Sequence, residues 1–412
     1  MTIHIIGAGL AGLSAAVRLA GVGREVNLIE ASAHAGGRCR SYHDGVLDMT
    51  LDNGNHLILS GNHATFDYLR VIGTEDRLVG PDEAVLDFHD LAADRRWTLR
   101  PNRSALAWWV FSEARRVPGT HAADYLALLA LLTPQGARRI DEVLACRGPL
   151  WDRLLEPFLL AALNTEVRSG SAALAGALIR ESLARGGDAY RPRIAHPTLS
   201  AAFIDPALEC LAARGAGIRF GQPVRSLRFE GDRLAAFSTA DTETTLAAGD
   251  SVVLATPPWI SQALVPGLTA PTAFNAIVNG HFRFSPPPGL APIVGVIGGA
   301  AQWIFAFADR LSVTVSAADD LADEDRHALA GRLWADVSRV HGLPGELPPF
   351  RIVKERRATF AATPEQNALR PGAATAWRNL VLAGDWTQTG LPATIEGAIR
   401  SGRAAAAMIG RL

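Results

Sequence analysis

The first thirty residues alternate between short apolar runs and a glycine-rich turn. The run Ile3–Ile6 predicts a buried strand, "GAGLAG" predicts a turn, and the small-residue run Leu10–Leu19 predicts a helix. A second strand, "GREVNLIE", then ends in Glu30. Together these form one strand–helix–strand unit of about 30 residues, the size of a right-handed crossover between parallel strands.

Farther along, the spacing of apolar residues changes first to that of helices and then back to that of strands. Residues 126–132, 150–163 and 172–183 carry apolar residues at helical spacing. After residue 196 the pattern returns to strands, with a hairpin about Gly231-Asp232, and residues 260–370 mix strands with one helix. The chain closes with the strand "NLVLAGD", a loop and a small-residue helix.

This order predicts an α/β fold in which one domain interrupts another. We expect a discontinuous nucleotide-binding domain made of 1–75, 196–260 and 371–412. The substrate-binding domain would comprise 76–195, mainly helical, and 261–370, a mixture of strands and helix.

Composition narrows the range of partners. The 412 residues carry 40 basic and 41 acidic side chains, and a net charge of −1 gives no field that would attract nucleic acid. The three cysteines, Cys39, Cys146 and Cys210, have no metal-binding spacing and no disulfide framework, so we expect a cytoplasmic protein without a metal site. No run approaches the ~20 apolar residues of a membrane-spanning helix.

The glycines of the first turn carry the first chemical signal. Gly7, Gly9 and Gly12 form G-x-G-x-x-G between a strand and a helix, where backbone N–H groups face a pyrophosphate. Glu30 follows at the spacing of the acid that accepts hydrogen bonds from ribose hydroxyls. These features predict an adenine dinucleotide, either NAD or FAD.

Two further motifs favour FAD. Gly36-Gly37-Arg38 after Glu30, and "LVLAGDWTQTGLPATIEGAIRSGRAAA" near the C-terminus, resemble the flavin amine oxidase and phytoene desaturase superfamily. The resemblance implies a Rossmann-like FAD-binding domain of the glutathione-reductase/amine-oxidase type with an interleaved α+β substrate-binding domain. It also implies non-covalent FAD held by residues from all parts of the chain. These are Gly7, Gly9, Gly12, Glu30, Gly36, Gly37, Arg38, Asn53, Gly54, Asn55, Val224, Gly384, Asp385, Thr394 and Ile395.

Within that superfamily, several blocks resemble one family in particular. "LDNGNHLILSGN", "HPTLSAAFIDPALECL", "IVNGHFRF" and "KERRATFAATPEQ" are similar to the hydroxysqualene dehydroxylases of bacterial hopanoid and squalene biosynthesis. The resemblance implies that reduced FAD serves to remove an allylic hydroxyl from a C30 isoprenoid, hydroxysqualene, to give squalene. Amine oxidation fits poorly, because Asn279 occupies the position of the lysine that amine oxidases usually carry.

The segment Leu51–Ala64 holds the candidates for the acid that assists hydroxyl departure. Asp52-Asn53-Gly54-Asn55-His56 is a polar cluster inside an apolar stretch. We expect His56 to act as the acid, with Asp52 orienting it or carrying the proton, and His281 as a further catalytic candidate. Glu166 is a fourth, near a predicted cavity wall.

Two other functions share these features. One is a carotenoid-type desaturase that oxidises a polyprenyl chain, and the other is a non-catalytic prenyl-lipid carrier without flavin. In the leading interpretation the reducing equivalents come from a separate reductase or from NAD(P)H, because no second dinucleotide motif follows a strand. An apolar substrate also suggests peripheral contact with the inner face of the cell membrane, with Trp108-Trp109 and Arg115-Arg116 as the candidate contact.

Overall fold

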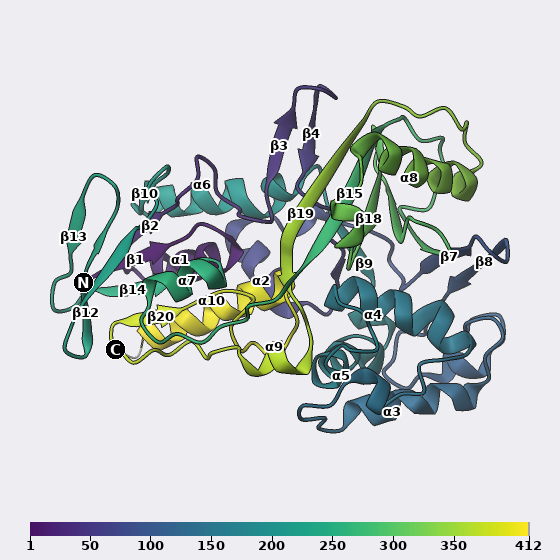
Figure 1. The fold of residues 1–412 in the computed structure, drawn as a ribbon, viewed down its shortest axis with the longest axis horizontal. Coiled ribbons are helices and arrows are strands. Elements are labelled where there is room, and N and C mark those ends of the chain that lie inside the picture. The colour runs from purple at the N-terminus through teal and green to yellow at the C-terminus, as the bar shows by residue number, and fades with distance from the viewer. Residues whose placement is uncertain (411–412) are drawn as a thin grey trace.

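A five-stranded parallel sheet forms the amino-terminal side of the molecule (Figure 1). The structure is a computed structural model that describes residues 1–410. The sheet has the order β10-β2-β1-β14-β20, and every neighbouring pair is parallel. Its strands are β1 (Thr2–Ile6), β2 (Glu25–Ile29), β10 (Gly217–Arg219), β14 (Ser251–Leu254) and β20 (Leu380–Leu382).

Both faces of this sheet are covered, which explains why β1 is apolar almost throughout. Ile3 and Ile5 pack in one cluster with α1 (Leu10–Gly21) and α10 (Ile395–Ile409). His4 points the other way, and its ring meets Phe237 at 5.2 Å. Phe237 belongs to an antiparallel sheet of three strands, β11 (Ser226–Glu230), β12 (Arg233–Ser238) and β13 (Glu243–Thr245).

Helices α1 and α10 approach each other closely because small residues line their contact. A Cβ added to Gly402 would overlap the carbonyl oxygen of Ala11. Ser14 donates its hydroxyl to the carbonyl of Ile399 at 3.0 Å, so the two helices are also hydrogen-bonded. The small-residue run near the C-terminus therefore lets the last helix lie directly on the first.

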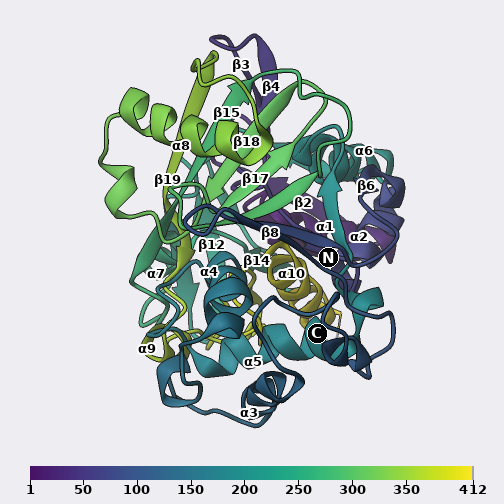
Figure 2. The same cartoon turned by 90° about the vertical axis from the view of Figure 1, so that its right-hand side faces the viewer.

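A second, larger sheet has seven strands (Figure 2). Its order is β19-β15-β18-β17-β16-β7-β8. Helix α8 (Arg326–His341) covers one face, where Phe282 and Trp334 pack with ring centroids 5.2 Å apart. The strands are β7 (Leu86–Asp90), β8 (Arg95–Leu99), β15 (Phe274–Arg283), β16 (Ile293–Ile297), β17 (Trp303–Ala306), β18 (Arg310–Val315) and β19 (Phe350–Phe360).

Short helices gather at the side of the molecule away from the N-terminus (Figure 1). They are α3 (Ala127–Leu132), α4 (Glu156–Leu163), which a π-helical turn Trp151–Leu155 precedes, and α5 (Ala172–Glu181). The remaining elements connect these parts. They are β3 (Ser41–Asp44), β4 (Met49–Asp52), β5 (Ile58–Leu59), β6 (Leu78–Val79), β9 (Pro192–Ala195), α2 (His63–Ile72), α6 (Asp205–Ala213), α7 (Pro258–Leu264) and α9 (Pro364–Ala368).

The elements that the patterns predicted are present, but the structure adds others that were not predicted, among them α2, the β3-β4 pair and β9. The predicted helices coincide with α3, α4 and α5, and the hairpin about Gly231-Asp232 joins β11 to β12. The hairpin β7-β8 was not predicted, and it adds two strands from the mainly helical segment 76–195 to a sheet built otherwise from 261–370. The domain boundaries stay predictions, and residues 411–412 of the last predicted segment lie outside the described residues.

The contact between α1 and α10 generates a stability prediction. Gly402→Ala should destabilise the fold by about 1–3 kcal/mol, because the added methyl overlaps the α1 backbone. Gly331→Ala is the matched control, since Gly331 lies in α8 and its Cβ would meet nothing within 4 Å. This control should be neutral or stabilising by ~0.5–1 kcal/mol. Urea unfolding of both variants measures the difference, and equal stabilities would contradict the packing argument.

Candidate active site

The glycine-rich turn between β1 and α1 fits a pyrophosphate. Gly7 has φ 109°, and a Cβ on it would lie 2.6 Å from the carbonyl oxygen of Ala255. A Cβ on Gly12 would overlap the carbonyl oxygen of Gly7, but a Cβ on Gly9 would meet nothing within 4 Å. The first and third glycines are thus required by protein packing, and the second faces open space.

The first turn of α1 leaves donors for a ligand. The cap residue Gly9 has no side chain, and within residues 1–410 the N–H groups of Ala11 and Gly12 have no hydrogen-bond acceptor. The helix dipole adds positive potential at the same point. Free amides, positive potential and the space at Gly9 together suit the phosphates of a dinucleotide.

Glu30 and the Gly36-Gly37 pair complete this region, which we call the dinucleotide cradle. Glu30 follows β2 directly, and its Oε2 accepts from the amide of Ala8 at 2.7 Å. Gly36 (φ 102°) pairs with Gly9 in an isolated parallel bridge. The amide of Gln222 donates to the carbonyl of Glu30 at 2.9 Å, which brings the half-buried Val224 near the cradle, in a connecting segment rather than in a strand.

The C-terminal motif meets the N-terminal motif through one ion pair. Nη2 of Arg38 donates to both carboxylate oxygens of Asp385, at 2.6 and 2.7 Å. The other terminal nitrogen of Arg38 donates to the carbonyl of Ala358. Gly384, with φ 156°, donates its amide to Ser401 Oγ at 2.8 Å in α10. Two motifs 347 residues apart in sequence therefore form one wall of the site.

Helix α10 points unpaired amides at the site as well. Thr394 caps the helix, and its hydroxyl accepts from the amide of Gly397 at 3.0 Å. The amides of Ile395 and Glu396 find no acceptor among the described residues. Such a helix start can stabilise negative charge on a bound flavin.

A buried ionic network fixes the position of α10. Glu396 is 3% exposed, and its carboxylate accepts from the amides of Ala64 and Thr65 at the start of α2, at 3.1 and 2.8 Å. Arg400 donates to Glu396 at 2.8 Å and to both carboxylate oxygens of Glu181 at the end of α5. The network joins α10, α2 and α5, and the sequence patterns did not point to any of its three members.

The polar segment 52–56 is held mainly by the seven-stranded sheet. Asn55 donates its side-chain amide to Thr314 Oγ1 at 3.0 Å, and Thr314 donates to Asn279 Oδ1 at 2.7 Å. The side-chain amide of Asn279 donates to the carbonyl of Asn53 at 3.5 Å. A Cβ on Gly54 would lie 2.9 Å from Nδ2 of Asn279. We call Asn53, Asn55, Asn279 and Thr314 the asparagine cluster.

The asparagine cluster revises the expected role of its members. Asn53, Gly54 and Asn55 were expected to face the cofactor, but most of their polar groups bind β15 and β18 or, in the case of the Asn53 amide N–H, the carbonyl of Arg40. Within the asparagine cluster, the Asn55 side-chain oxygen is the one side-chain atom that is buried without a partner among the described residues. That oxygen could accept a hydrogen bond from a ligand.

His56 is half-buried and neutral at pH 7. Burial, reinforced by the positive charge of Arg38, lowers the pKa of His56 to about 4. No hydrogen bond joins His56 to Asp52 within residues 1–410, so the expected pairing is wrong. His56 can therefore offer a neutral N–H donor rather than an imidazolium.

Asp52 serves instead as a buried junction. It is 4% exposed and accepts from Ser41 Oγ at 2.6 Å and from the amide of Leu199 at 2.9 Å. Arg310 Nη2 lies 4.0 Å away. Burial raises the pKa of Asp52, an effect that these partners offset only in part.

His281 and Glu166 lie in very different surroundings. His281 is fully buried on the same face of β15 as Asn279, and its Nδ1 lies 2.8 Å from Ser312 Oγ. Burial, with Arg310 nearby, lowers its pKa to about 3. Glu166 is exposed and accepts from the amides of Arg168 and Ser169, so it stabilises a turn and does not line a cavity wall.

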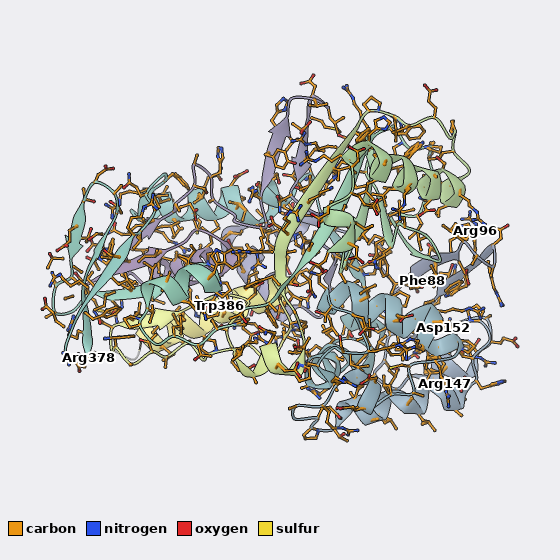
Figure 3. All side chains as sticks on the ribbon, viewed as in Figure 1. Phe88, Arg96, Arg147, Asp152, Arg378 and Trp386 are labelled. Atoms are coloured by element: carbon orange, nitrogen blue, oxygen red, sulfur yellow. The ribbon has the colours of Figure 1, made fainter. Side chains whose placement is uncertain are left out.

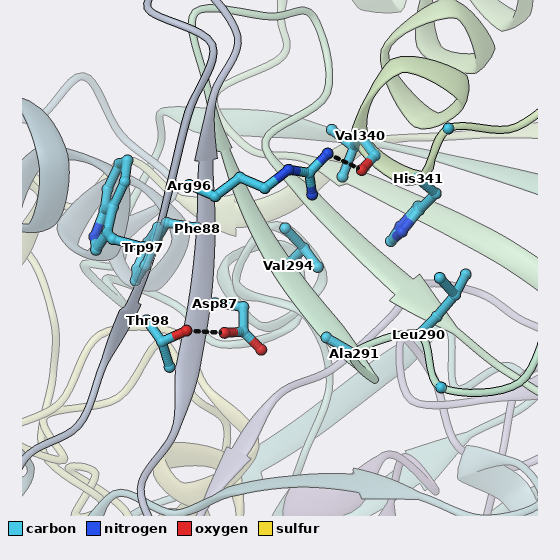
Figure 4. A pocket seen from close by; sticks show the side chains of 12 residues that line it. Asp87, Phe88, Arg96, Trp97, Thr98, Leu290, Ala291, Val294, Val340 and His341 are labelled. Atoms are coloured by element: carbon cyan, nitrogen blue, oxygen red, sulfur yellow. Dashed lines mark hydrogen bonds between the residues drawn. The ribbon is translucent and has the colours of Figure 1, made fainter.

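Two cavities lie away from these residues. The larger, about 600 Å³, lies between the β7-β8 hairpin, β16 and the end of α8 (Figure 4). In it Arg96 donates to the carbonyl of Val340 at 2.6 Å and Thr98 donates to Asp87 at 2.5 Å. Figure 3 places Phe88 and Arg96 of this region far from Trp386, which follows Asp385. Among the described residues no group of three or more His, Cys, Asp or Glu could hold a metal ion.

Comparison with known proteins agrees with the cradle. Residues 10–410 match the model of the flavin containing amine oxidoreductase family. The chain is 53% identical to hydroxysqualene dehydroxylase of Rhodopseudomonas palustris, over 99% of this chain and 98% of the relative. It is 50% identical to the protein of that name from Sinorhizobium fredii, over 98% of this chain and 97% of the relative.

The chain belongs to the hydroxysqualene dehydroxylase family. This places it within the flavin containing amine oxidoreductases, as the Gly-Gly-Arg and C-terminal motifs predicted. The chain is an FAD-dependent oxidoreductase, and the predicted α/β fold of the amine-oxidase type is confirmed.

Solved structures give the same fold. Cyclohexylamine oxidase from Brevibacterium oxydans superposes with a TM-score of 0.72 at 15% identity, covering 100% of this chain and 99% of that one. Putrescine oxidase gives a TM-score of 0.70 at 16% identity and covers both chains completely. At this identity the likeness concerns the fold alone.

The open space at Gly9 generates a test of cofactor binding. Gly9→Ala should leave folding intact, because its Cβ meets no protein atom, but should weaken FAD binding at least tenfold, since the methyl occupies the space facing the phosphates. The ratio of flavin to protein absorbance, with unfolding of the flavin-free protein, measures both effects. Gly331→Ala is the control, and full flavin content in Gly9→Ala would contradict this assignment.

Proposed function

We propose that this enzyme removes the hydroxyl group of hydroxysqualene to give squalene, in bacterial hopanoid and squalene biosynthesis. The observation that carries the proposal is 53% identity over nearly the whole length of a relative named hydroxysqualene dehydroxylase. In the reaction the C–O bond breaks, the hydroxyl departs as water with one proton, and the carbon takes up a hydride. Reduced FAD supplies the two electrons and two hydrogens that this balance requires.

A continuous apolar core extends from the cradle into the helical part. One continuous cluster of buried residues includes Ile6 and Leu254 beside the cradle, Trp386 after the C-terminal motif, and Leu159 and Leu163 of α4. An apolar surrounding suits a C30 isoprenoid and keeps water from the carbon that loses its hydroxyl. This continuity supports a polyprenyl substrate over a small polar amine.

His56 is the residue that we assign to the departing hydroxyl. It follows the asparagine cluster directly, and Arg38 of the flavin motif lies near enough to lower its pKa. A neutral imidazole N–H in this position donates a hydrogen bond to the leaving oxygen. Asp52 and His281 are further candidates for this role; among the described residues Asp52 binds Ser41 and Leu199, His281 binds Ser312, and neither bonds to His56.

Reducing equivalents would come from outside the dinucleotide cradle. The sequence contains one G-x-G-x-x-G turn after a strand, at Gly7–Gly12, and we assign this turn to FAD. A separate reductase or NAD(P)H bound in another manner would therefore reduce the flavin. We also propose a cytoplasmic enzyme at the inner face of the cell membrane, since Cys39, Cys146 and Cys210 are free thiols and the substrate is a lipid.

An anaerobic single turnover tests the function. The enzyme, reduced chemically and mixed with hydroxysqualene, should form one squalene for each flavin oxidised, and the oxidised enzyme should form none. Chromatography of the lipid and the flavin spectrum follow the two products. Failure of the reduced enzyme, together with desaturation of a polyprenyl chain by the oxidised enzyme, would favour the desaturase alternative.

The state of His56 gives a second prediction. His56→Ala should lower kcat by about 100-fold with flavin content unchanged, and His56→Gln, which keeps an N–H donor, should lose about tenfold or less. Because the pKa of His56 is lowered to about 4, kcat should stay constant from pH 6 to 8. An acid with the ordinary histidine pKa would lose activity as the pH rises through ~6.5. Such a loss, or full activity of His56→Ala, would remove His56 from this role.

A further inference from the structure

Exposed apolar side chains concentrate in one short part of the chain. Twelve large apolar residues are exposed among residues 1–410, and five of them fall between 106 and 129. These five, which we call the apolar face, are Leu106 (78% exposed), Trp108 (48%), Phe111 (76%), Leu126 (63%) and Leu129 (57%). A concentration of this kind on a folded protein marks an interaction surface.

The two segments that carry these residues are neighbours in space. Trp109, from the turn Trp108–Phe111, packs edge-to-face against Tyr125 with ring centroids 5.2 Å apart. Tyr125 also accepts from the amide of Val117 at 2.9 Å. Both rings are buried, so the expectation that Trp109 faces a membrane is wrong, and Trp108 alone of the pair is exposed. Trp108 and Leu126 of the apolar face directly adjoin this buried pair in sequence.

Positive charge accompanies the apolar face. Segment 100–129, which carries the face, contains four arginines against two acids, Glu113 and Asp124, and so has a net charge of +2 in a chain of net charge −1. Arg115 lies over the Trp108 ring at 5.0 Å. Within residues 1–410, Arg100, Arg115 and Arg116 take part in no salt bridge, which leaves their charge for an outside partner.

A cavity adjoins the same face. It has a volume of about 330 Å³ and lies between the segment Ala123–Ala127 and the π-helical turn, with Leu144, Leu150, Trp151 and Leu155 among its lining residues. Arg147, which also lines it, lies in the helical part away from the N-terminus (Figure 3). Leu150, Trp151 and Leu155 belong to the apolar cluster that reaches the cradle.

We propose that the apolar face docks onto the surface of an anionic bilayer and that the adjoining cavity admits the polyprenyl chain from it. Leu106, Phe111, Leu126 and Leu129 would enter the boundary between headgroups and acyl chains, and the arginines would contact lipid phosphates. No described helix is long and apolar enough to cross a membrane, so the docking is interfacial. The claim that a polyprenyl chain enters the cavity from the bilayer rests on the proposed function. The claim that the protein docks on the bilayer rests only on the exposed apolar residues and the unpaired arginines.

Vesicle binding tests the proposal. The holoenzyme is centrifuged with vesicles of pure phosphatidylcholine or of phosphatidylcholine with one-third phosphatidylglycerol. Wild type should bind the anionic vesicles, and the variant L106S/F111S/L126S/L129S should bind them at least tenfold more weakly. The matched control V22S/V46S removes two side chains that are 71% and 72% exposed outside the face, and should bind like wild type.

Two further measurements distinguish loss of docking from loss of folding or of chemistry. Full flavin content and unchanged turnover of detergent-solubilised hydroxysqualene by the quadruple variant would show that folding and chemistry are intact. Equal vesicle binding by wild type and the quadruple variant would overturn the proposal, as would a wild-type dimer that dissociates on mutation and never binds vesicles. Absence of turnover in wild type would count against the proposed function alone.

Discussion

The ion pair between Arg38 and Asp385 is the contact on which the site depends. One terminal nitrogen of Arg38 reaches both carboxylate oxygens of a residue 347 positions away. Asp385 follows β20, an edge strand of the parallel sheet, and Arg38 follows the bridge between Gly36 and the first glycine-rich turn. A charge-assisted pair with nearly equal distances fixes both orientation and separation. It thereby aligns two helix starts, those of α1 and α10, on one ligand.

The asparagine cluster has a similar role, because it ties the segment after β4 to the seven-stranded sheet. Strand alternation on β15 turns Val278 and Phe282 toward α8 and leaves Asn279 and His281 on the opposite face. Asn279 there binds Asn53 and Thr314, so one amide side chain holds this segment against β15 and β18. An uncharged side chain suits a site whose substrate has no charge to recognise.

The sequence was sufficient to predict those parts of the fold that depend on residues close together along the chain. The glycines at 7, 9 and 12, and the acid at 30, have roles that follow from spacing, so the cradle could be predicted before its geometry was known. The hairpin β7-β8 could not, because its strands are stabilised by distant partners: β7 pairs with β16, and Phe88 stacks on Trp97 and meets Trp303. The pairing of Asp52 was mispredicted for the same reason, since its partner Leu199 lies 147 residues away.

The charge state of His56 could not be predicted from the sequence either. A sequence gives His56 its ordinary pKa, but burial and Arg38 lower it, and neither effect can be read from neighbours along the chain. In the network of Glu396, Arg400 and Glu181, the first two are spaced i,i+4 on α10 and are a local signal, but Glu181 of α5 and the amides of α2 lie far away in sequence and could not be predicted. That network has a mechanical consequence. It ties α10, whose first amides would hold a bound flavin, to α5 in the helical part, so a shift of α5 when lipid enters would move those amides. The colour of the cofactor would then report substrate arrival before any bond is broken.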